Sequence, residues 1–536
     1  MFERRSKTKI VLLLICLTSI YVQAETNNYK KYDGFVIDSV IIENRNIYDL
    51  SEDKFDNFLF KTANKLHLKT KKNIIRQELL LFPGDNFDSR LALETERNLR
   101  HNLIIYDAYL LIEKNSNNKL VINVVTVDQW SFIGSLNFKR EGNLNSFNVL
   151  VEERNFLGLN KFLSLNYFSE PIEKDYINLT FLEKRLFYQP LRFLWFYSNS
   201  RTNQTNHIVV SHPYYNLLQS YSYSFNFGFS ETITKQYYDS LEIAEKKINS
   251  DYFGFGFNYR IGSYDKKMKI SGVYDYRNNK VIEQNVMQGF NDSIETFQDS
   301  LIHRLGFGVS FNTYNFIKLQ QVDGYGYVED FNIGYQASLF LFRKYDNDFE
   351  QVDENEISMV AGFSGFRENN LYSLVLNNSI WLRDGKKIRN YSKIRLSWYN
   401  LNLDYVTFVF RGKYDYNWSI SNSNNLILSG ISDLRGYPKY YKTGNKRIVL
   451  NHEARFFTGL EILSVNLGVA LFTDIGNVWK YGEKVSMSDF KSNIGVGLRF
   501  YPERVSNNSV VRMDFSYSRE FDWSVSINSN HYFDAL

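Results

Sequence analysis

Three charged residues near the C-terminus have the types needed for a buried ionic site. Arg435 follows a polar segment and lies within the tetrapeptide LRGY, whereas Glu453 and Asp474 lie within two runs of alternating apolar and polar residues. A guanidinium group offers a planar fork of N–H donors that fits carboxylates. The chemistry available to these residues is therefore charge pairing, in which no covalent bond is made or broken.

The spacing of the residues around Glu453 and Asp474 predicts which way the two carboxylates face. Side chains alternate between the two faces of a strand, so every second residue shares a face. The two sets that share a face are Val449, Asn451, Glu453 and Arg455, and Ser464, Asn466, Gly468 and Asp474. On neighbouring strands both carboxylates would face one interior, where Arg435 can fold in between them. The alternative is that both are ordinary interior residues, solvated or paired with Arg455 and Lys480.

Alternation with a period of two continues through most of the chain after Trp130. Aromatic or aliphatic residues occupy one face, and small, polar or charged residues occupy the other. The clearest runs are residues 221–230, 253–260, 493–500 and 511–518. About twenty such runs can be counted. The number of strands should be even if both ends of the sheet lie on the same side of a membrane.

Two architectures alternate in this way, a transmembrane β-barrel and a water-soluble β-sandwich. Glycines on the polar face fit a curved wall around a wet interior, and Tyr and Phe at strand ends fit the aromatic girdles of a membrane protein. The chain has 44 Phe and 39 Tyr, enough to supply such girdles. The pattern favours the transmembrane barrel, with the polar segments 232–250, 280–300 and 345–356 as extracellular loops.

Residues 1–24 have the pattern of a secretory signal peptide. Basic residues precede an apolar run from Ile10 to Ile20, and a cleavage-site pattern ends at Ala24. The only cysteine, Cys16, lies within this segment, so the mature chain suits an oxidising compartment. No later stretch reaches about 18 consecutive apolar residues, so the sequence predicts no helical membrane span.

Residues 25–129 form a different unit, in which helical periodicity appears between short strands. Strands are predicted at residues 36–44, 104–112 and 120–127. Thr70 is expected to cap one helix and Asp88 a second helix. The second helix would carry Leu91, Thr95, Leu99 and Leu103 on one face. The predicted order is β-α-α-β-β, a small α+β domain.

An ordered set of motifs occupies the last quarter of the chain. The motifs are LSGISDLRGYPKYYKTGNKRIVLNHEARFF, LGVALFTDIGNVW, IGVGLRFYP and VVRMDFSYS. This set resembles the barrel signature of the BamA/TamA superfamily of outer-membrane assembly and secretion proteins. The N-terminal unit resembles a single POTRA domain, and EERNFLGLNKFLSLNYF resembles the first barrel hairpin. Residues 200–400 show only the alternation of a barrel.

The resemblance implies a fold and a set of site residues. The fold is a transmembrane antiparallel β-barrel of about 16 strands at residues 130–536, preceded by a POTRA domain at residues 25–129. A loop would tuck into the barrel and be held there by an arginine between two carboxylates. The residues that match this loop latch are Arg435, Gly436, Tyr437, Glu453, Asp474 and Gly476. The residues expected at the seam between the first and last strands, or in a C-terminal recognition signal, are Trp130, Phe138, Trp523, Val525, Ile527 and Phe533.

The resemblance also implies a function in a Gram-negative outer membrane, with the POTRA domain in the periplasm. The expected activity is insertion of β-barrel proteins, or translocation of polypeptides, without nucleotide hydrolysis. Its partners would be the lipid bilayer and unfolded outer-membrane or secreted polypeptides, bound at the POTRA sheet and the barrel seam. The alternatives are a two-partner-type secretion pore and a passive porin or channel. Because only one POTRA domain fits before Trp130, a specialised or accessory factor is favoured.

Composition and motifs argue against other classes of protein. A net charge of +4 over 536 residues gives no concentrated basic stripe, so no nucleic-acid partner is expected. Gly362-Phe363-Ser364-Gly365 lacks the spacing of a G-x-S-x-G elbow, no H-E-x-x-H motif occurs, and the seven His are scattered. We therefore expect no enzymatic activity, no cofactor and no metal.

Overall fold

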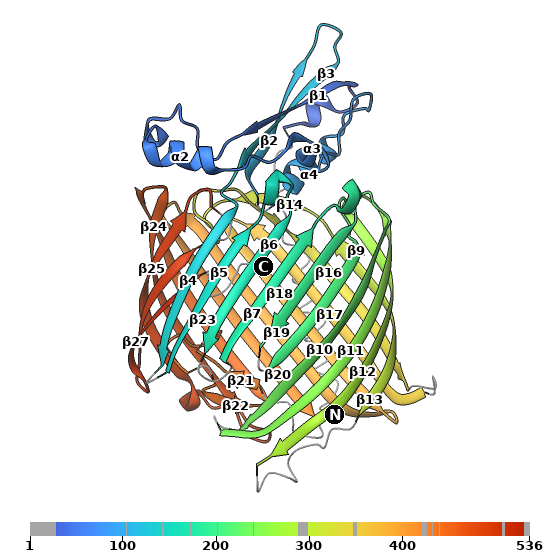
Figure 1. Ribbon diagram of the computed structural model, residues 1–536, viewed down its shortest axis with the longest axis vertical. Coiled ribbons are helices and arrows are strands. Elements are labelled where there is room, and N and C mark those ends of the chain that lie inside the picture. Colours follow the sequence, from blue (N-terminus) through green and yellow to red (C-terminus); the bar gives the residue numbers. More distant parts are fainter. Residues whose placement is uncertain are drawn as a thin grey trace, which may run out of the picture.

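A large antiparallel sheet and a small mixed sheet organise the computed structural model of the chain (Figure 1). The structure describes residues 28–102, 104–141, 144–170, 174–200, 202–238, 241–287, 299–346, 351–419, 426–430, 432–438, 440–505 and 510–529. The expected signal peptide, residues 1–24, lies outside the described residues. Among the described residues, no helix is long and apolar enough to cross a membrane.

The large sheet contains long strands joined by links at alternating ends. Its strands are β4 (Phe132–Glu141), β5 (Leu144–Glu153), β6 (Phe162–Glu170), β7 (Lys174–Glu183), β8 (Arg192–Asn199), β9 (Asn203–His212), β10 (Tyr221–Tyr238), β11 (Leu241–Gly262), β12 (Lys266–Val286), β13 (Ser300–Thr313), β16 (Gly334–Tyr345), β17 (Gln351–Arg367), β18 (Asn370–Arg383), β19 (Lys386–Leu403), β20 (Val406–Ser419), β23 (Lys446–Ile462), β24 (Val465–Trp479), β25 (Lys491–Pro502), β26 (Val511–Ser518) and β27 (Asp522–Ser529). Successive strands pair antiparallel, and β27 is followed by β4 in the strand order, so the sheet curves round into a barrel.

The apolar side chains of the barrel strands point outward. Along β25, Ile494, Val496 and Leu498 are exposed, whereas Asn493 and Arg499 are buried. A water-soluble β-sandwich has the reverse arrangement, because its apolar face forms the core. The barrel is therefore the alternative that the structure adopts, and the expected antiparallel sheet is confirmed.

The strand count differs from the number of about sixteen that the resemblance implies. Twenty strands take part in the barrel sheet within the described residues, as the count of alternating runs predicts. The resemblance rests on motifs near the two ends of the chain, so it carried no information about the strands between residues 200 and 400. Each added strand widens the barrel.

The polar segments expected as extracellular loops are largely strands. Residues 232–238 and 241–250 belong to β10 and β11, 280–286 to β12, and 351–356 to β17. The expectation of loops was wrong here, because backbone pairing in an established register needs no apolar side chains and continues past the apolar belt. Residues 239–240, 288–298 and 347–350 lie outside the described residues.

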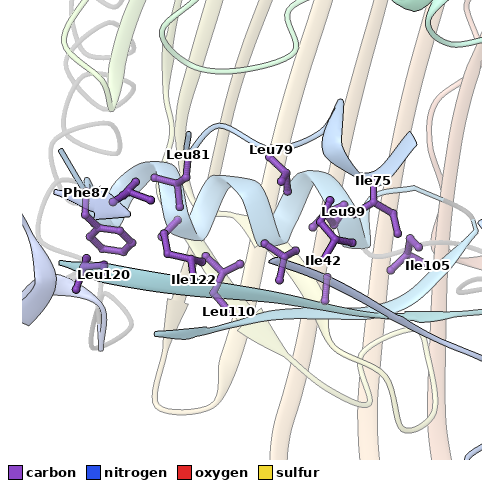
Figure 2. Close-up of a cluster of buried hydrophobic side chains, with 14 of the residues drawn as sticks. Ile42, Ile75, Leu79, Leu81, Phe87, Leu99, Ile105, Leu110, Leu120 and Ile122 are labelled. Atoms are coloured by element: carbon purple, nitrogen blue, oxygen red, sulfur yellow. The ribbon is translucent and has the colours of Figure 1, made fainter. Parts of the chain in front are cut away.

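The N-terminal module, residues 28–128, is built on a three-stranded sheet. Its strands are β1 (Ile37–Arg45), β2 (Ile105–Lys114) and β3 (Leu120–Asp128), in the order β1-β3-β2, and its helices are α2 (Phe58–Leu66), α3 (Lys72–Arg76) and α4 (Ser89–Arg100). Figure 2 shows side chains from the helices and strands, among them Ile42, Ile75, Leu99 and Ile122, meeting in one apolar core.

The helices of the module differ from the expected pair. The helix α2 was not predicted; Asn57 caps it by accepting hydrogen bonds from two backbone N–H groups. The N-cap of α3 is Lys71, so the expected cap at Thr70 was wrong. The Thr70 hydroxyl accepts a hydrogen bond from Asn155 at 2.9 Å, so it serves the contact with the barrel. The cap of α4 at Asp88 is confirmed.

The helix α4, the second of the two predicted helices, carries the expected apolar face. Thr95 and Leu99 are buried, and Leu91 is partly buried against the core. Leu103, also expected on this face, lies outside the described residues.

The module lies across one mouth of the barrel (Figure 1). Glu78 of the module pairs with Arg185 in the link between β7 and β8, at 3.0 Å. Glu94 on α4 accepts a hydrogen bond from the Leu217 N–H, in the link between β9 and β10, at 2.7 Å. Buried carboxylates of the module therefore hold the turns at this mouth.

Two links between barrel strands carry short hairpins. β14 (Phe316–Leu319) and β15 (Glu329–Asn332) lie between β13 and β16, at the mouth covered by the module. β21 (Leu426–Leu428) and β22 (Lys442–Gly444) lie between β20 and β23, at the opposite end (Figure 1). Short 3-10 helices are η2 (Lys30–Tyr32), η3 (Asp53–Phe55), η4 (Phe156–Gly158), η5 (Leu186–Tyr188) and η7 (Met487–Asp489).

Candidate functional site

The link between β20 and β23 places Arg435 inside the barrel. Its Nε and Nη2 atoms donate to Asp474 Oδ2 and Oδ1 at 2.9 and 2.7 Å, and its Nη1 atom donates to Glu453 Oε1 at 2.7 Å. Its backbone N–H also donates to Asp474, at 3.0 Å. Arg435, Glu453 and Asp474 are 2%, 1% and 0% exposed. The three residues selected from the sequence therefore meet in one buried site.

The register of β23 and β24 explains why the two carboxylates converge. Asn451 lies opposite Asp474, and Glu453 lies opposite Phe472, so all four side chains share the inner face. The Phe472 ring centre lies 3.6 Å from the guanidinium carbon of Arg435. A cation over an aromatic face is stabilised by the ring quadrupole, so the wall supplies both ionic and aromatic contacts to Arg435.

Glu453 is shared by three arginines. Besides Arg435, Arg499 donates to its Oε1 atom at 3.1 Å, and Arg455 donates to its Oε2 atom at 2.9 Å. Arg499 also pairs with Asp514 at 2.7 Å. Burying an ion costs several kcal/mol unless partners compensate it, and here each buried charge has such partners. The contact with Arg455, expected as the alternative to the Arg435 contact, thus exists beside it.

Asp474 also joins the loop backbone to the wall. The side-chain amides of Asn451 and Asn493 donate to it at 2.8 and 3.0 Å. The Asn493 amide donates in addition to the Arg435 carbonyl oxygen at 2.6 Å. The loop is therefore held through its backbone as well as through its guanidinium group.

Gly436 and Tyr437 bring the loop tip against the last two strands. Gly436 has a φ of 83°, and a Cβ atom there would lie 2.6 Å from the hydroxyl oxygens of Ser516 on β26 and Ser524 on β27. The Tyr437 hydroxyl donates to Glu520, in the link between these strands, at 2.7 Å. The motif R-G-Y therefore combines an ionic anchor, a close backbone approach and an aromatic contact.

Gly476 is required by close packing between β23 and β24. It lies opposite Val449, and a Cβ atom at Gly476 would lie 2.9 Å from the Ile448 carbonyl oxygen and 3.1 Å from a Val449 methyl carbon. Gly476 therefore allows β23 and β24 to pack closely in the wall of the site, and it takes no part in the ionic contacts.

A second ionic cluster at the base of the loop was missed in the sequence. Asp433 is fully buried and pairs with Lys413 and Arg447, each at 3.0 Å, and it accepts a hydrogen bond from the Ser429 N–H at 3.0 Å. Arg447 also pairs with Asp415 at 2.7 Å. The signal available was the placement of Lys413, Asp415 and Arg447 at inward positions of β20 and β23.

The residues expected at the seam are divided between two places. Trp130 precedes β4, and its side chain packs against an apolar cluster of the module, while its backbone N–H donates to the Arg504 carbonyl oxygen at 2.6 Å. The expectation that Trp130 belongs to the seam strand was therefore wrong. Trp130 lies at the junction of the module and the barrel, because the linker must bridge the two sheets before β4 begins.

The remaining seam candidates lie on the strands that adjoin in the ring. Phe138 belongs to β4, where it pairs with Phe147 of β5. Trp523, Val525 and Ile527 belong to β27 and are exposed on its outer face. Phe533 lies outside the described residues. That these residues take part in a seam that opens remains a prediction.

The arrangement is suited to holding a loop by charge. Arg455 and Arg499 were not named as site residues, although their alternation with apolar neighbours indicates an inward position. Asp323, which pairs with Arg455 at 2.8 Å, carries no such signal because it lies in an irregular link. Among the described residues, no three His, Cys, Asp or Glu side chains are grouped so as to hold a metal ion.

Comparisons with known proteins give matches among solved structures. No protein-family model matches the chain, and no curated protein sequence matches it. A structure of BamA from Haemophilus ducreyi lacking POTRA domains 1-3 matches with 12% identity and a TM-score of 0.38, covering 92% of this chain and 84% of that chain. CdiB from Escherichia coli matches with 11% identity and a TM-score of 0.45, covering 97% and 96%.

CdiB from Acinetobacter baumannii is a further match, with 10% identity and a TM-score of 0.39, covering 98% of this chain and 97% of that chain. All three matched chains are under 25% identical to this chain, with TM-scores below 0.5. The fold of this chain is defined by its own strand order and strand registers.

Proposed function

We propose that this chain is an outer-membrane β-barrel of the BamA/TamA type. It inserts β-barrel proteins into the outer membrane or passes polypeptides across it. Its N-terminal module acts as a POTRA domain in the periplasm. The membrane bilayer surrounds the outward apolar face of the barrel, as expected for strands that alternate apolar-out and polar-in. The process requires no nucleotide and no covalent chemistry, and the chain acts on its substrates without being an enzyme.

The observation that carries this proposal is the position of the module on the barrel mouth. The turns of the barrel contact Glu78 and Glu94 of the module at 3.0 and 2.7 Å, so a polypeptide bound to the module is delivered directly to the barrel. A passive porin has no use for such a module. The position of the module therefore supports a function in handling polypeptides.

The edge of the module sheet offers a binding mode for an unfolded polypeptide. An extended peptide can add a strand to an exposed sheet edge through main-chain hydrogen bonds. The edge strand β2 is already occupied by side chains: Arg100 donates to the Ala108 carbonyl at 2.8 Å, the Leu110 N–H donates to Glu96 at 3.0 Å, and Tyr29 donates to the Leu110 carbonyl at 3.1 Å. On β1 the corresponding contacts lie near the two ends, where Ile37 pairs with the backbone of Gly84 and Asp85 and the Asn44 carbonyl accepts from Lys69 at 2.7 Å. We therefore assign the receiving edge to the middle of β1.

The loop latch supports a role at the seam. The tip of the loop lies against Ser516 of β26 and Ser524 of β27, and β27 is the strand next to β4 in the ring. Movement of β27 away from β4 would disturb the contact at Gly436. The latch holds the last strands in place until a substrate engages.

A reconstitution experiment tests the proposal. The folding rate of an unfolded test barrel into liposomes is measured by protease protection, with and without the purified protein. We expect acceleration that is lost in Arg435→Ala and retained in Glu368→Gln, a matched control at an exposed turn where Glu368 pairs only with Arg367 among the ion pairs of the described residues. No acceleration, together with a stable ion conductance, would contradict insertion and favour the secretion pore.

A further inference from the structure

The link between β13 and β16 forms an element that packs against the inner face of the barrel wall at the module end. We call this element, residues 314–333, the inner hairpin; it contains the antiparallel pair β14 and β15. Its residues Ile317, Val322 and Ile333 are buried in one cluster with Tyr399 and Val409. Val409 lies opposite Glu453 in the register of β20 and β23, so the cluster lies on the inner face of the wall.

The tip of the inner hairpin binds the wall through Arg455. The Arg455 Nη1 atom donates to the Val322 carbonyl oxygen at 2.7 Å and to Asp323 Oδ1 at 2.8 Å. The Thr407 hydroxyl donates to the Gln321 carbonyl oxygen at 2.8 Å. Arg455 is 1% exposed, so these contacts are made away from solvent. The tip is therefore fixed at one particular arginine of the wall.

Glu329 closes the tip internally. Its Oε1 atom accepts hydrogen bonds from the N–H groups of Val322 at 3.0 Å, Asp323 at 3.3 Å and Gly324 at 3.2 Å. A side-chain oxygen that accepts hydrogen bonds from successive N–H groups in this way holds a turn in one shape. The inner hairpin is therefore a preformed unit, which can move as a whole.

The inner hairpin and the link between β20 and β23, which we call the outer loop, meet at Glu453. One oxygen of Glu453 binds Arg455, which holds Asp323 of the inner hairpin, and the other oxygen binds Arg435 of the outer loop at 2.7 Å. Release of Asp323 would leave Arg455 free to take a larger share of Glu453, in competition with Arg435. The two elements, which enter from opposite mouths, are thus connected through two wall residues.

The base of the inner hairpin is attached to the module. Arg100 on α4 donates to both carboxylate oxygens of Asp330 at 2.9 Å, and Lys318 pairs with Glu96 at 3.0 Å. The Arg97 guanidinium carbon lies 3.6 Å from the ring centre of Phe316. Arg100 and Glu96 are buried, so a movement of α4 would be transmitted to the hairpin.

Space for such a movement exists beside the hairpin. A cavity of about 930 Å³ is lined by Arg100 and Asn102 of the module, by Asp330 of the hairpin and by Gln336 and Ser364 of the wall. Its lining is shared by all three parts, so the hairpin has space on its cavity side, and a shift into that space would separate its apolar residues from Tyr399 and Val409 of the wall.

We propose that the inner hairpin is a gate at the periplasmic mouth, controlled by the module through Arg100 and Asp330 and coupled to the outer loop through Arg455 and Glu453. The gate keeps the barrel closed at the module end. Displacement of α4, as when a polypeptide binds the module, withdraws the hairpin and weakens the hold on Arg435. The identity of the transported molecule, a polypeptide, rests on the function proposed above, whereas the gate itself does not.

Two readouts on the full chain test the gate, and neither uses a substrate polypeptide. The first is ion conductance in planar bilayers of neutral phospholipid. The second is the rate at which a maleimide labels Leu434→Cys, a buried reporter in the outer loop, since Cys16 is the sole natural cysteine. A failed insertion assay therefore leaves both readouts interpretable.

Asp323→Asn is the principal variant, and Glu368→Gln at the same mouth is its matched control. We expect Asp323→Asn to raise the conductance and to accelerate labelling about tenfold, which corresponds to about 1.4 kcal/mol, while the control leaves both unchanged. Asp330→Asn, at the module end, should raise the conductance as well. Folding of each variant is verified by heat-modifiable migration in gels.

Three results would overturn the proposal in whole or in part. Equal conductance and equal labelling rates in Asp323→Asn and the control would contradict the gate. A higher conductance without faster labelling would contradict the coupling to the outer loop. A higher conductance in Asp323→Asn, with no increase in Asp330→Asn, would contradict control by the module.

Discussion

Arg435 and Asp474 form a two-point ion pair inside the barrel, in which Nε and Nη2 of the arginine donate to the two carboxylate oxygens at 2.9 and 2.7 Å. Both side chains are almost fully buried. The pair connects the loop between β20 and β23 to the wall strand β24, although 39 residues of chain separate the partners. A loop that would otherwise extend from the barrel end is therefore part of its interior.

Removal of Arg435 should destabilise the barrel. Arg435→Ala leaves Asp474 buried without its cation and removes one of the three arginines that pair with Glu453, and breaking a buried pair in this way costs about 3 to 5 kcal/mol. Arg435→Lys keeps the charge but lacks the planar fork of N–H donors, so its stability should lie between that of the unsubstituted protein and that of Arg435→Ala. The urea midpoint of unfolding in micelles measures the effect. Asp474→Asn combined with Arg435→Met should recover part of the loss, and an unchanged midpoint in Arg435→Ala would contradict the latch.

Gly436 should tolerate substitution less well than Gly459. Both have a positive φ, 83° and 73°, so alanine costs about 1 to 2 kcal/mol at either position. Only at Gly436 would the new Cβ atom meet other atoms closely, at 2.6 Å from Ser516 and Ser524, whereas nothing lies within 4 Å at Gly459. Thermal unfolding should show a larger loss for Gly436→Ala, and Ser524→Gly should restore part of it. Equal losses would show that the tip does not press against these strands.

The strand β1 should receive an extended polypeptide in preference to β2. Ile41 on β1 and Leu111 on β2 are similarly exposed, at 51% and 48%, so they form a matched pair of positions for a photo-crosslinking amino acid. We expect several-fold more crosslinking of an unfolded test barrel at position 41, because side chains occupy the edge of β2. Equal crosslinking, or more at position 111, would contradict the assignment of the edge.

His67 and Asp128 should give the module opposite dependences on pH. Burial lowers the pKa of His67 to about 4, with a smaller contribution from Lys69, and burial raises the pKa of Asp128 to about 6. The stability from His67 is present above its ordinary value of 6.5 and is lost as the pH falls towards 4. The stability from Asp128 is present below 3.8 and is lost as the pH rises towards 6.

The two contributions have opposite slopes between pH 4 and 6, and the His67 Nε2 and Asp128 Oδ2 atoms lie 3.7 Å apart, so single variants are needed to separate the two groups. Asp128→Asn should lose up to about 3 kcal/mol as the pH falls from 6.5 to 4. His67→Gln should lose a similar amount as the pH rises from 3.8 to 6. Hydrogen exchange of the module backbone in the full chain measures both slopes. Slopes of the same sign in the two variants would contradict the burial of one of these groups.

Local rules predicted those features that depend on local patterns. The strands at residues 36–44, 104–112 and 120–127 and the cap at Asp88 follow from hydrophobic period and capping chemistry, and they occur as expected. The helix α2 was missed because it is short and its apolar residues are largely exposed, among them Phe58 and Leu66. The polar halves of β10 and β11 were missed because inter-strand pairing, which no single segment encodes, maintains them.

The sequence by itself determined that Glu453 and Asp474 face the interior, because alternation along a strand ties the position of a residue to a face of the sheet. It also supplied the arginine that lies between them. Only the tertiary structure decided that Asp323 binds Arg455, across 132 residues, and that Arg499 and Asp514 complete the network. Those contacts depend on the register of many strands and on how an irregular link folds back, and neither is set by the residues nearby in the chain.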